Sequence, residues 1–130
     1  MIVLDYRDRR PLYEQVAERF QELMFREILP QDAKLPSVRS LATDLSINPN
    51  TIQRAYQELE RQGYIYSVKG KGSFVADNSR IRTAMQREWR ERFTASVAEG
   101  LRMGVTEDEM EALIRQKWRQ PVTEGGKSDD

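Results

Sequence analysis

Hydrophobic residues recur at spacings of three and four over two short stretches near the middle of the chain. The first stretch predicts a helix that begins after Ser37, whose hydroxyl can accept a hydrogen bond from an otherwise unpaired backbone N–H. Its apolar face consists of Val38, Leu41, Ala42 and Leu45. Residues 46–48 leave room only for a turn before the second stretch. The pattern therefore predicts two helices joined by a tight turn.

The second helix is predicted from Pro49 to Gln62. Asn48 can cap it, Pro49 suits a first position that needs no N–H, and Gly63 can end it. Its inward residues are Ile52, Ala55, Tyr56 and Leu59. Its outer positions carry short polar and long basic side chains, namely Asn50, Thr51, Gln53, Arg54 and Gln57. Such side chains can reach the base edges and phosphates of DNA.

A small hairpin is predicted after this helix. Residues 64–68 are aromatic and β-branched, which favours a strand, and residues 73–75 return as a second strand. The turn between them carries Lys69 and Lys71 on either side of Gly70. Glycines let such a turn approach a phosphate backbone or the floor of a minor groove.

The N-terminal part predicts a short strand at residues 2–5 and a helix from Pro11 to about Leu29, ended by Pro30. The inward face of this helix should contain Leu12, Val16, Phe20, Leu23 and Ile28. We expect the helix to pack across the back of the helix pair.

Two further helices are predicted at about 80–103 and up to about Arg119, the second opened by a capping box of Thr106 and Glu109. Their aromatic surface exceeds what a two-helix hairpin can bury, which predicts pairing with a second copy. The residues expected in this dimer contact are Met85, Trp89, Phe93, Val97, Leu113 and Trp118. Residues 121–130 read as a disordered polar tail.

Composition excludes several classes of function. The 130 residues include no cysteine and no histidine, so a disulfide, a thiolate nucleophile, the usual general base and the commonest metal ligand are all missing. Acidic residues at 107–111 suit the start of a helix and do not require a metal. We therefore expect no catalytic residues, metal or cofactor. Without a signal peptide or a membrane-length apolar window, a cytoplasmic protein is expected.

The net charge of zero is a mild argument against a nucleic-acid binder, but residues 34–72 carry a surplus of three positive charges (six basic, three acidic). Three stretches between residues 35 and 76, LPSVRSLA, INPNTIQRAYQELERQGYI and KGKGSFVA, resemble the winged helix-turn-helix of bacterial GntR-type transcriptional regulators. The resemblance covers about the first 78 residues. The short C-terminal part is similar to that of the YtrA-like branch.

The resemblance implies a mainly α fold with a small antiparallel β wing. It implies a DNA-binding domain at 1–78, followed at 79–120 by a two-helix dimerisation or effector region. It also implies operator contacts by Arg39, Asn48, Asn50, Thr51, Gln53, Arg54 and Gly70. Ser37, Lys69 and Lys71 complete the expected DNA-binding set. The function expected is that of a homodimeric repressor of an inverted-repeat operator, of a transporter operon by analogy, with an unidentified small-molecule effector as a further partner.

Simpler interpretations stay open for individual residues. Arg39 can be an ordinary solvated residue, Arg54 can pair with Glu58, and the wing lysines can serve solubility alone. The aromatic residues Trp89, Phe93 and Trp118 can line an effector pocket instead of a dimer core, whereas Tyr56, Tyr64 and Tyr66 are expected in the core or at its edge. For the whole protein, the alternatives are a winged-helix adaptor that binds only proteins and, less favoured, the DNA-binding half of an enzyme.

Overall fold

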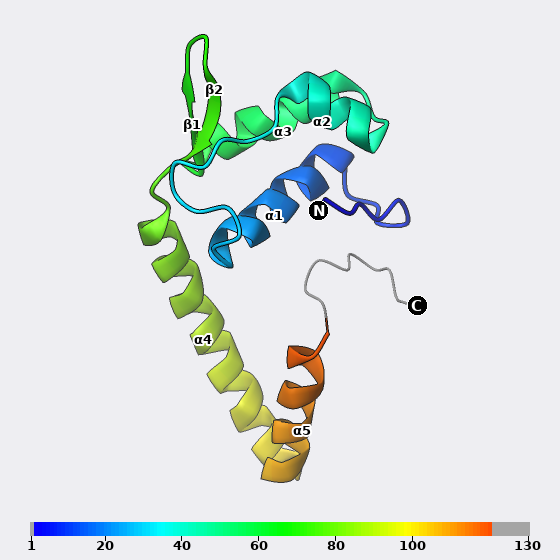
Figure 1. Cartoon of the computed structure of the whole chain (residues 1–130). Coiled ribbons are helices and arrows are strands. Elements are labelled where there is room, and N and C mark those ends of the chain that lie inside the picture. The colour runs from blue at the N-terminus through cyan, green and yellow to red at the C-terminus, as the bar shows by residue number, and fades with distance from the viewer. Residues whose placement is uncertain (1, 121–130) are drawn as a thin grey trace. The chain divides into compact units, whose positions relative to one another are not determined.

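The computed structural model describes residues 2–120 of the chain, which form two compact units, residues 2–78 and 79–120. The first unit contains α1 (Leu12–Phe25), α2 (Val38–Leu45), α3 (Pro49–Arg61), β1 (Ile65–Val68) and β2 (Gly72–Val75) (Figure 1). The second contains α4 (Ser79–Arg102) and α5 (Glu107–Trp118). The predicted fold class, mainly helical with a small antiparallel wing, is confirmed. The predicted tail at 121–130 lies outside the described residues.

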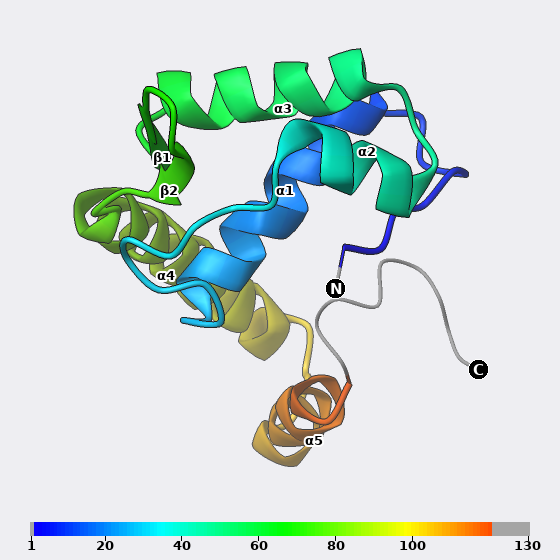
Figure 2. The same ribbon diagram turned by 45° about the horizontal axis from the view of Figure 1, so that its top comes forward.

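The core of the first unit forms where α1 and α2 pack against α3 (Figure 2). Val16 and Phe20 from α1 and Ile52 and Leu59 from α3 are completely buried. The ring of Phe20 meets the ring of Tyr56 edge-on, with 5.7 Å between their centres. This edge-to-face arrangement is the favourable one for aromatic pairs. All four residues predicted on the inward face of α3 are buried, so the sequence periodicity assigned that face correctly.

The strand predicted at residues 2–5 is wrong. Side chains of α1 use the backbone groups that a neighbouring strand would need. Gln15 accepts the N–H of Asp5 through its side-chain oxygen at 2.9 Å, and Arg19 donates to the carbonyl of Val3 at 3.0 Å. The segment is therefore tied to α1 in an irregular conformation.

The helix predicted to reach Leu29 ends at Phe25. Glu27 adopts a left-handed conformation (φ 64°), and the N–H groups of Ile28 and Leu29 both donate to the carbonyl of Leu23. This bonding closes the last helical turn and redirects the chain before Pro30. Ile28, predicted to face inward, is consequently 52% exposed.

The second unit is a pair of helices with a capped connection. Gly104 has φ 83° after the end of α4, as a helix-ending glycine requires. The capping box before α5 is confirmed, because the Thr106 hydroxyl accepts the N–H of Glu109 and the Glu109 carboxylate accepts the N–H of Thr106. Neither helix contains a buried residue in the single chain.

Candidate nucleic-acid interface

The N-termini of α2 and α3 are fixed by the two predicted caps. The hydroxyl of Ser37 accepts the N–H of Ser40 at 3.0 Å, and the side-chain oxygen of Asn48 accepts the N–H of Asn50 at 2.8 Å. Pro49 stands at the start of α3, as expected. Because the caps use only acceptors, the hydroxyl proton of Ser37 and the amide NH2 of Asn48 remain able to donate to an outside acceptor.

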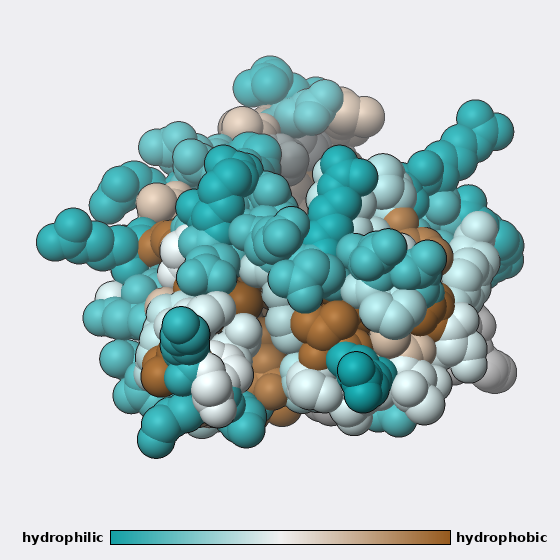
Figure 3. Space-filling view, turned by 90° about the horizontal axis from the view of Figure 1, so that it is seen from above, coloured by the Kyte–Doolittle hydropathy of each residue, from teal (hydrophilic) through white to brown (hydrophobic). Residues whose placement is uncertain are grey.

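The outer face of α3 is polar and accessible. Asn50, Gln53, Arg54 and Gln57 are exposed, and Thr51 is half-buried. The face that looks upward in Figure 1, where the wing, α2 and α3 lie uppermost, consists largely of hydrophilic side chains (Figure 3). A helix with one buried and one polar face can enter the major groove without exposing its apolar side.

Arg54 is held by a residue that the sequence did not indicate. Its guanidinium carbon lies 4.0 Å from the ring centre of Tyr13, at the start of α1. This is cation–π geometry. The structure shows no salt bridge between Arg54 and Glu58, because the Glu58 carboxylate instead accepts hydrogen bonds from Arg61 and Gln62. Tyr13 was missed because its contact joins two helices far apart in the sequence.

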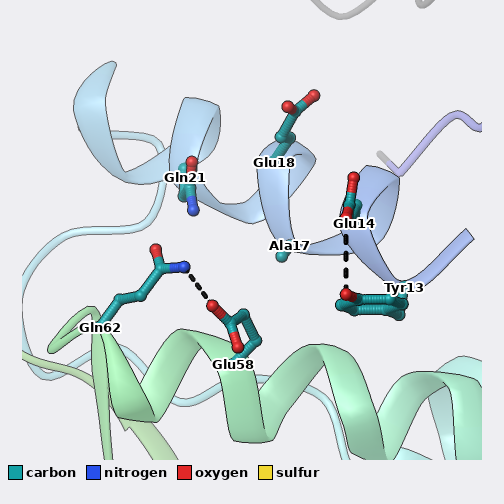
Figure 4. Close-up of a pocket in the computed structure, with 7 residues that line it drawn as sticks. All are labelled: Tyr13, Glu14, Ala17, Glu18, Gln21, Glu58 and Gln62. Carbon is teal, nitrogen blue, oxygen red and sulfur yellow. Dashed lines mark hydrogen bonds between the residues drawn. The ribbon is translucent and has the colours of Figure 1, made fainter. Parts of the chain in front are cut away.

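A pocket of about 220 Å³ lies between α1 and α3, and Tyr13 is one of the residues that line it (Figure 4). Three carboxylates, those of Glu14, Glu18 and Glu58, contribute to its lining. The hydrogen bond from Arg61 holds the pKa of Glu58 below its usual range, which keeps that carboxylate ionised. The pocket is thus unsuited to a phosphate. Among residues 2–120 no cluster of acidic side chains could hold a metal ion.

The remaining predicted cations lie on α2 and the wing. Arg39 is exposed in the first turn of α2, and Lys69 and Lys71 are exposed at the wing tip. Within the described part of the chain, none of the three forms a salt bridge. Gly70 has φ 77°, and a Cβ added there would meet no atom within 4 Å. Glycine is therefore favoured at this position by the backbone conformation and not by crowding.

Tyr66 makes one contact within the wing and one with the segment before α2. Tyr66 stacks on Phe74 with 5.6 Å between ring centres, and its hydroxyl donates to Asp32 at 2.7 Å. This hydrogen bond raises the pKa of Tyr66.

Tyr56 and Tyr64 are buried, as expected. The hydroxyl of Tyr56 donates to the carbonyl of Pro36 at 2.7 Å, and burial raises its pKa.

The second unit exposes five of the six residues predicted for dimerisation, and the sixth, Val97, is half-buried. Trp89 and Phe93 stack with 5.2 Å between ring centres, yet they are 52% and 41% exposed, and Trp118 is 85% exposed. An apolar pocket of about 260 Å³ lies between α4 and α5. Phe93 contributes to its lining, but Trp89 and Trp118 do not. The three aromatic residues therefore do not form one effector pocket in the single chain.

These elements define a winged helix-turn-helix DNA-binding domain followed by a helical pair. The family model for "Bacterial regulatory proteins, gntR family" matches residues 12–75. The HTH-type transcriptional regulator YhcF of Bacillus subtilis is 38% identical over 93% of this chain and 97% of its own length. The chain belongs to the GntR family of transcriptional regulators, and it is a regulator, not an enzyme.

Other similar proteins add detail. The transcriptional repressor YtrA of Bacillus subtilis is 44% identical over 62% of each chain, so the match spans less than two thirds of that repressor. A GntR family regulator from Listeria monocytogenes has a TM-score of 0.63 at 31% identity, over 84% of this chain and 96% of that one. The DNA-binding domain of AraR, solved with operator ORE1, has a TM-score of 0.51 at 32% identity, over 58% of this chain and 93% of that one.

The part of the chain that the structure describes contains no helix with the length and apolar character needed to cross a membrane.

Proposed function

We propose that the protein is a homodimeric repressor that acts in the bacterial cytoplasm and reads an inverted-repeat operator. Each protomer would place the outer face of α3 in the major groove. The wing, with Lys69 and Lys71, would follow the adjacent backbone or minor groove, while Ser37 and Arg39 hold phosphate. The observation that carries the proposal is the capped α3, with Asn50, Gln53 and Arg54 exposed on one face and a buried opposite face.

The proposed dimer rests on the apolar surface of the second unit. Met85, Trp89, Phe93, Leu113 and Trp118 are all exposed in the single chain. Water contact of this many large apolar side chains is unfavourable, and a second copy would remove it. A two-fold dimer presents two equal α3 helices, which suits an inverted repeat with half-sites about 34 Å apart or more.

The repressor YtrA supports the sign of regulation, and resemblance to the YtrA-like branch extends the proposal to a neighbouring transporter operon. The test is selection of genomic DNA fragments by the purified full chain at moderate salt. The expected result is an enriched inverted repeat. Arg54→Ala should lose affinity and sequence preference, whereas Arg39→Ala should weaken binding to all sequences and reduce its dependence on salt.

Failure would take a recognisable form. An Arg54→Ala protein with unchanged operator affinity and preference would contradict the placement of α3 in the groove. A folded wild-type protein that enriches no fragment would favour a winged helix that binds a protein partner.

A further inference from the structure

A third backbone segment lies along the wing, on the side of β2 away from β1. The N–H of Leu35 donates to the carbonyl of Ser73, and the N–H of Val75 donates to the carbonyl of Ala33, both at 2.9 Å. Lys34 is thereby the antiparallel bridge partner of Phe74. The sequence pattern predicts no element for this segment, because its hydrogen bonds are made to residues about forty positions further along the chain.

The pairing fixes the direction of the Lys34 side chain. Directly paired residues in a sheet point to the same face, so Lys34 shares a face with Phe74 and Tyr66. Gly72 is two residues before Phe74 and belongs to that face as well. A Cβ added at Gly72 would lie 3.0 Å from Cε and 3.8 Å from Nζ of Lys34. The lysine stem therefore runs over the backbone of Gly72, where the missing side chain leaves room.

This path brings a third ammonium group onto the wing. Lys34 is exposed, and no salt bridge or hydrogen bond of its side chain is present among the described residues. The nearby carboxylate of Asp32 already accepts the hydroxyl of Tyr66. Lys69 and Lys71 follow on the turn that joins β1 to β2. The positive charge of Lys34, on the segment paired with β2, therefore adds to that of Lys69 and Lys71, and an anion beside the wing would lower the repulsion among the three.

We propose that Lys34 binds a phosphate of the DNA backbone beside the wing, which adds a phosphate contact next to Gly72, at the edge of the wing formed by β2. The inference rests on the proposed function, because it assumes that the wing lies against DNA. Its chemistry is that of a point charge on a flexible stem, which contributes affinity but no base preference.

The experiment compares full-length wild type, Lys34→Gln, Lys34→Arg and Lys117→Gln on the selected operator and on an unrelated duplex, at several salt concentrations. Lys117→Gln makes the same charge change in α5. Lys34→Gln should weaken binding to both duplexes by a similar factor. It should also make the salt dependence of binding less steep. The slope of the logarithm of the observed association constant against the logarithm of the salt concentration should become less negative by about 0.9 for each phosphate that the variant no longer neutralises. Lys34→Arg should keep the wild-type slope, and Lys117→Gln should behave as wild type.

Three outcomes would overturn the inference. The first is an unchanged slope for a folded Lys34→Gln protein while the slope for Lys69→Gln becomes less negative. The second is a loss of affinity without a change of slope, because that would indicate a structural role for the lysine stem. The third is a wild-type protein that binds no DNA, in which case the proposed function fails as well. In the first two cases the wild type still selects its operator, so the two failures are distinguishable.

Discussion

The guanidinium of Arg54 lies on the ring of Tyr13, with 4.0 Å between the Arg54 Cζ atom and the ring centre. Tyr13 belongs to α1, which packs behind α3, whereas Arg54 belongs to the face of α3 proposed to read DNA. A long side chain that is free in water loses conformational entropy when it binds. The Tyr13 ring restricts the Arg54 side chain before DNA binds. Because the ring is uncharged, Arg54 does not have to give up an ion pair with Tyr13 when it binds DNA.

Replacing Tyr13 should therefore affect DNA binding. Tyr13→Leu is expected to weaken operator affinity about two- to fivefold, since an exposed cation–π contact contributes about 0.5–1 kcal/mol. Tyr13→Phe keeps the ring and should bind as wild type. Fluorescence anisotropy titration with labelled operator measures both, with thermal unfolding as the check on folding. Equal affinities for the Leu and Phe variants would rule out a role for the ring.

The two helix caps should contribute separately to stability. Ser37→Ala and Asn48→Ala each remove an acceptor from a helix N-terminus, which should lower the free energy of unfolding by about 1 kcal/mol. Urea unfolding followed by circular dichroism measures this. Thr43→Ala, an exposed substitution within α2, is the matched control and should change stability much less. If all three variants unfolded at the same urea concentration, the caps would not contribute.

Alkaline pH should reveal the bond between Tyr66 and Asp32. The hydrogen bond raises the pKa of Tyr66 above its ordinary value of 10.0 in the folded protein. Its stabilising effect is fully present below pH 10 and is lost as pH rises through the raised pKa, because the unfolded chain releases the phenol proton first. Tyr66→Phe cannot titrate and should lose less stability above pH 10.

The measurement is urea unfolding of wild type and Tyr66→Phe across pH 7 to about 11. Part of the alkaline loss should remain in the variant, because burial also raises the pKa values of Tyr56 and Tyr64. Parallel curves for the two proteins throughout this range would mean that Tyr66 titrates as it does in the unfolded chain.

The apolar face of α4 should control self-association. Trp89→Glu places a charge among exposed apolar residues and is expected to give a monomer by light scattering after size exclusion. The same variant should lose most of its operator affinity, because each protomer would then bind a half-site alone. Ala84→Glu adds the same charge on another side of α4 and should remain a dimer. A dimeric Trp89→Glu protein would place the interface elsewhere.

Local rules in the sequence were sufficient for much of the DNA-binding unit. The caps at Ser37 and Asn48, the capping box at Thr106, and the buried face of α3 each depend on residues within about one or two helical turns. The glycine that follows α3, Gly63, has φ 91° for the same local reason. Interactions of this range can be read from spacing alone.

Two predictions failed where distant residues or a local backbone turn overrode the pattern. Residues 2–5 have a composition that permits a strand, but Gln15 and Arg19 of α1 bind their backbone. The periodicity of α1 extends to Ile28, but left-handed Glu27 ends the helix earlier. In both cases hydrogen bonds that the spacing of apolar residues does not encode set the conformation of the chain.

The helices, their caps and the inward face of α3 could be predicted from residue order, because they follow from hydrogen bonds and periodicity along one segment. The ring beneath Arg54 and the path of Lys34 over Gly72 could not, because each contact joins segments that are distant in the chain. Such contacts exist only after the helices and strands have packed, and packing therefore selects which side chains hold Arg54 and cross the wing.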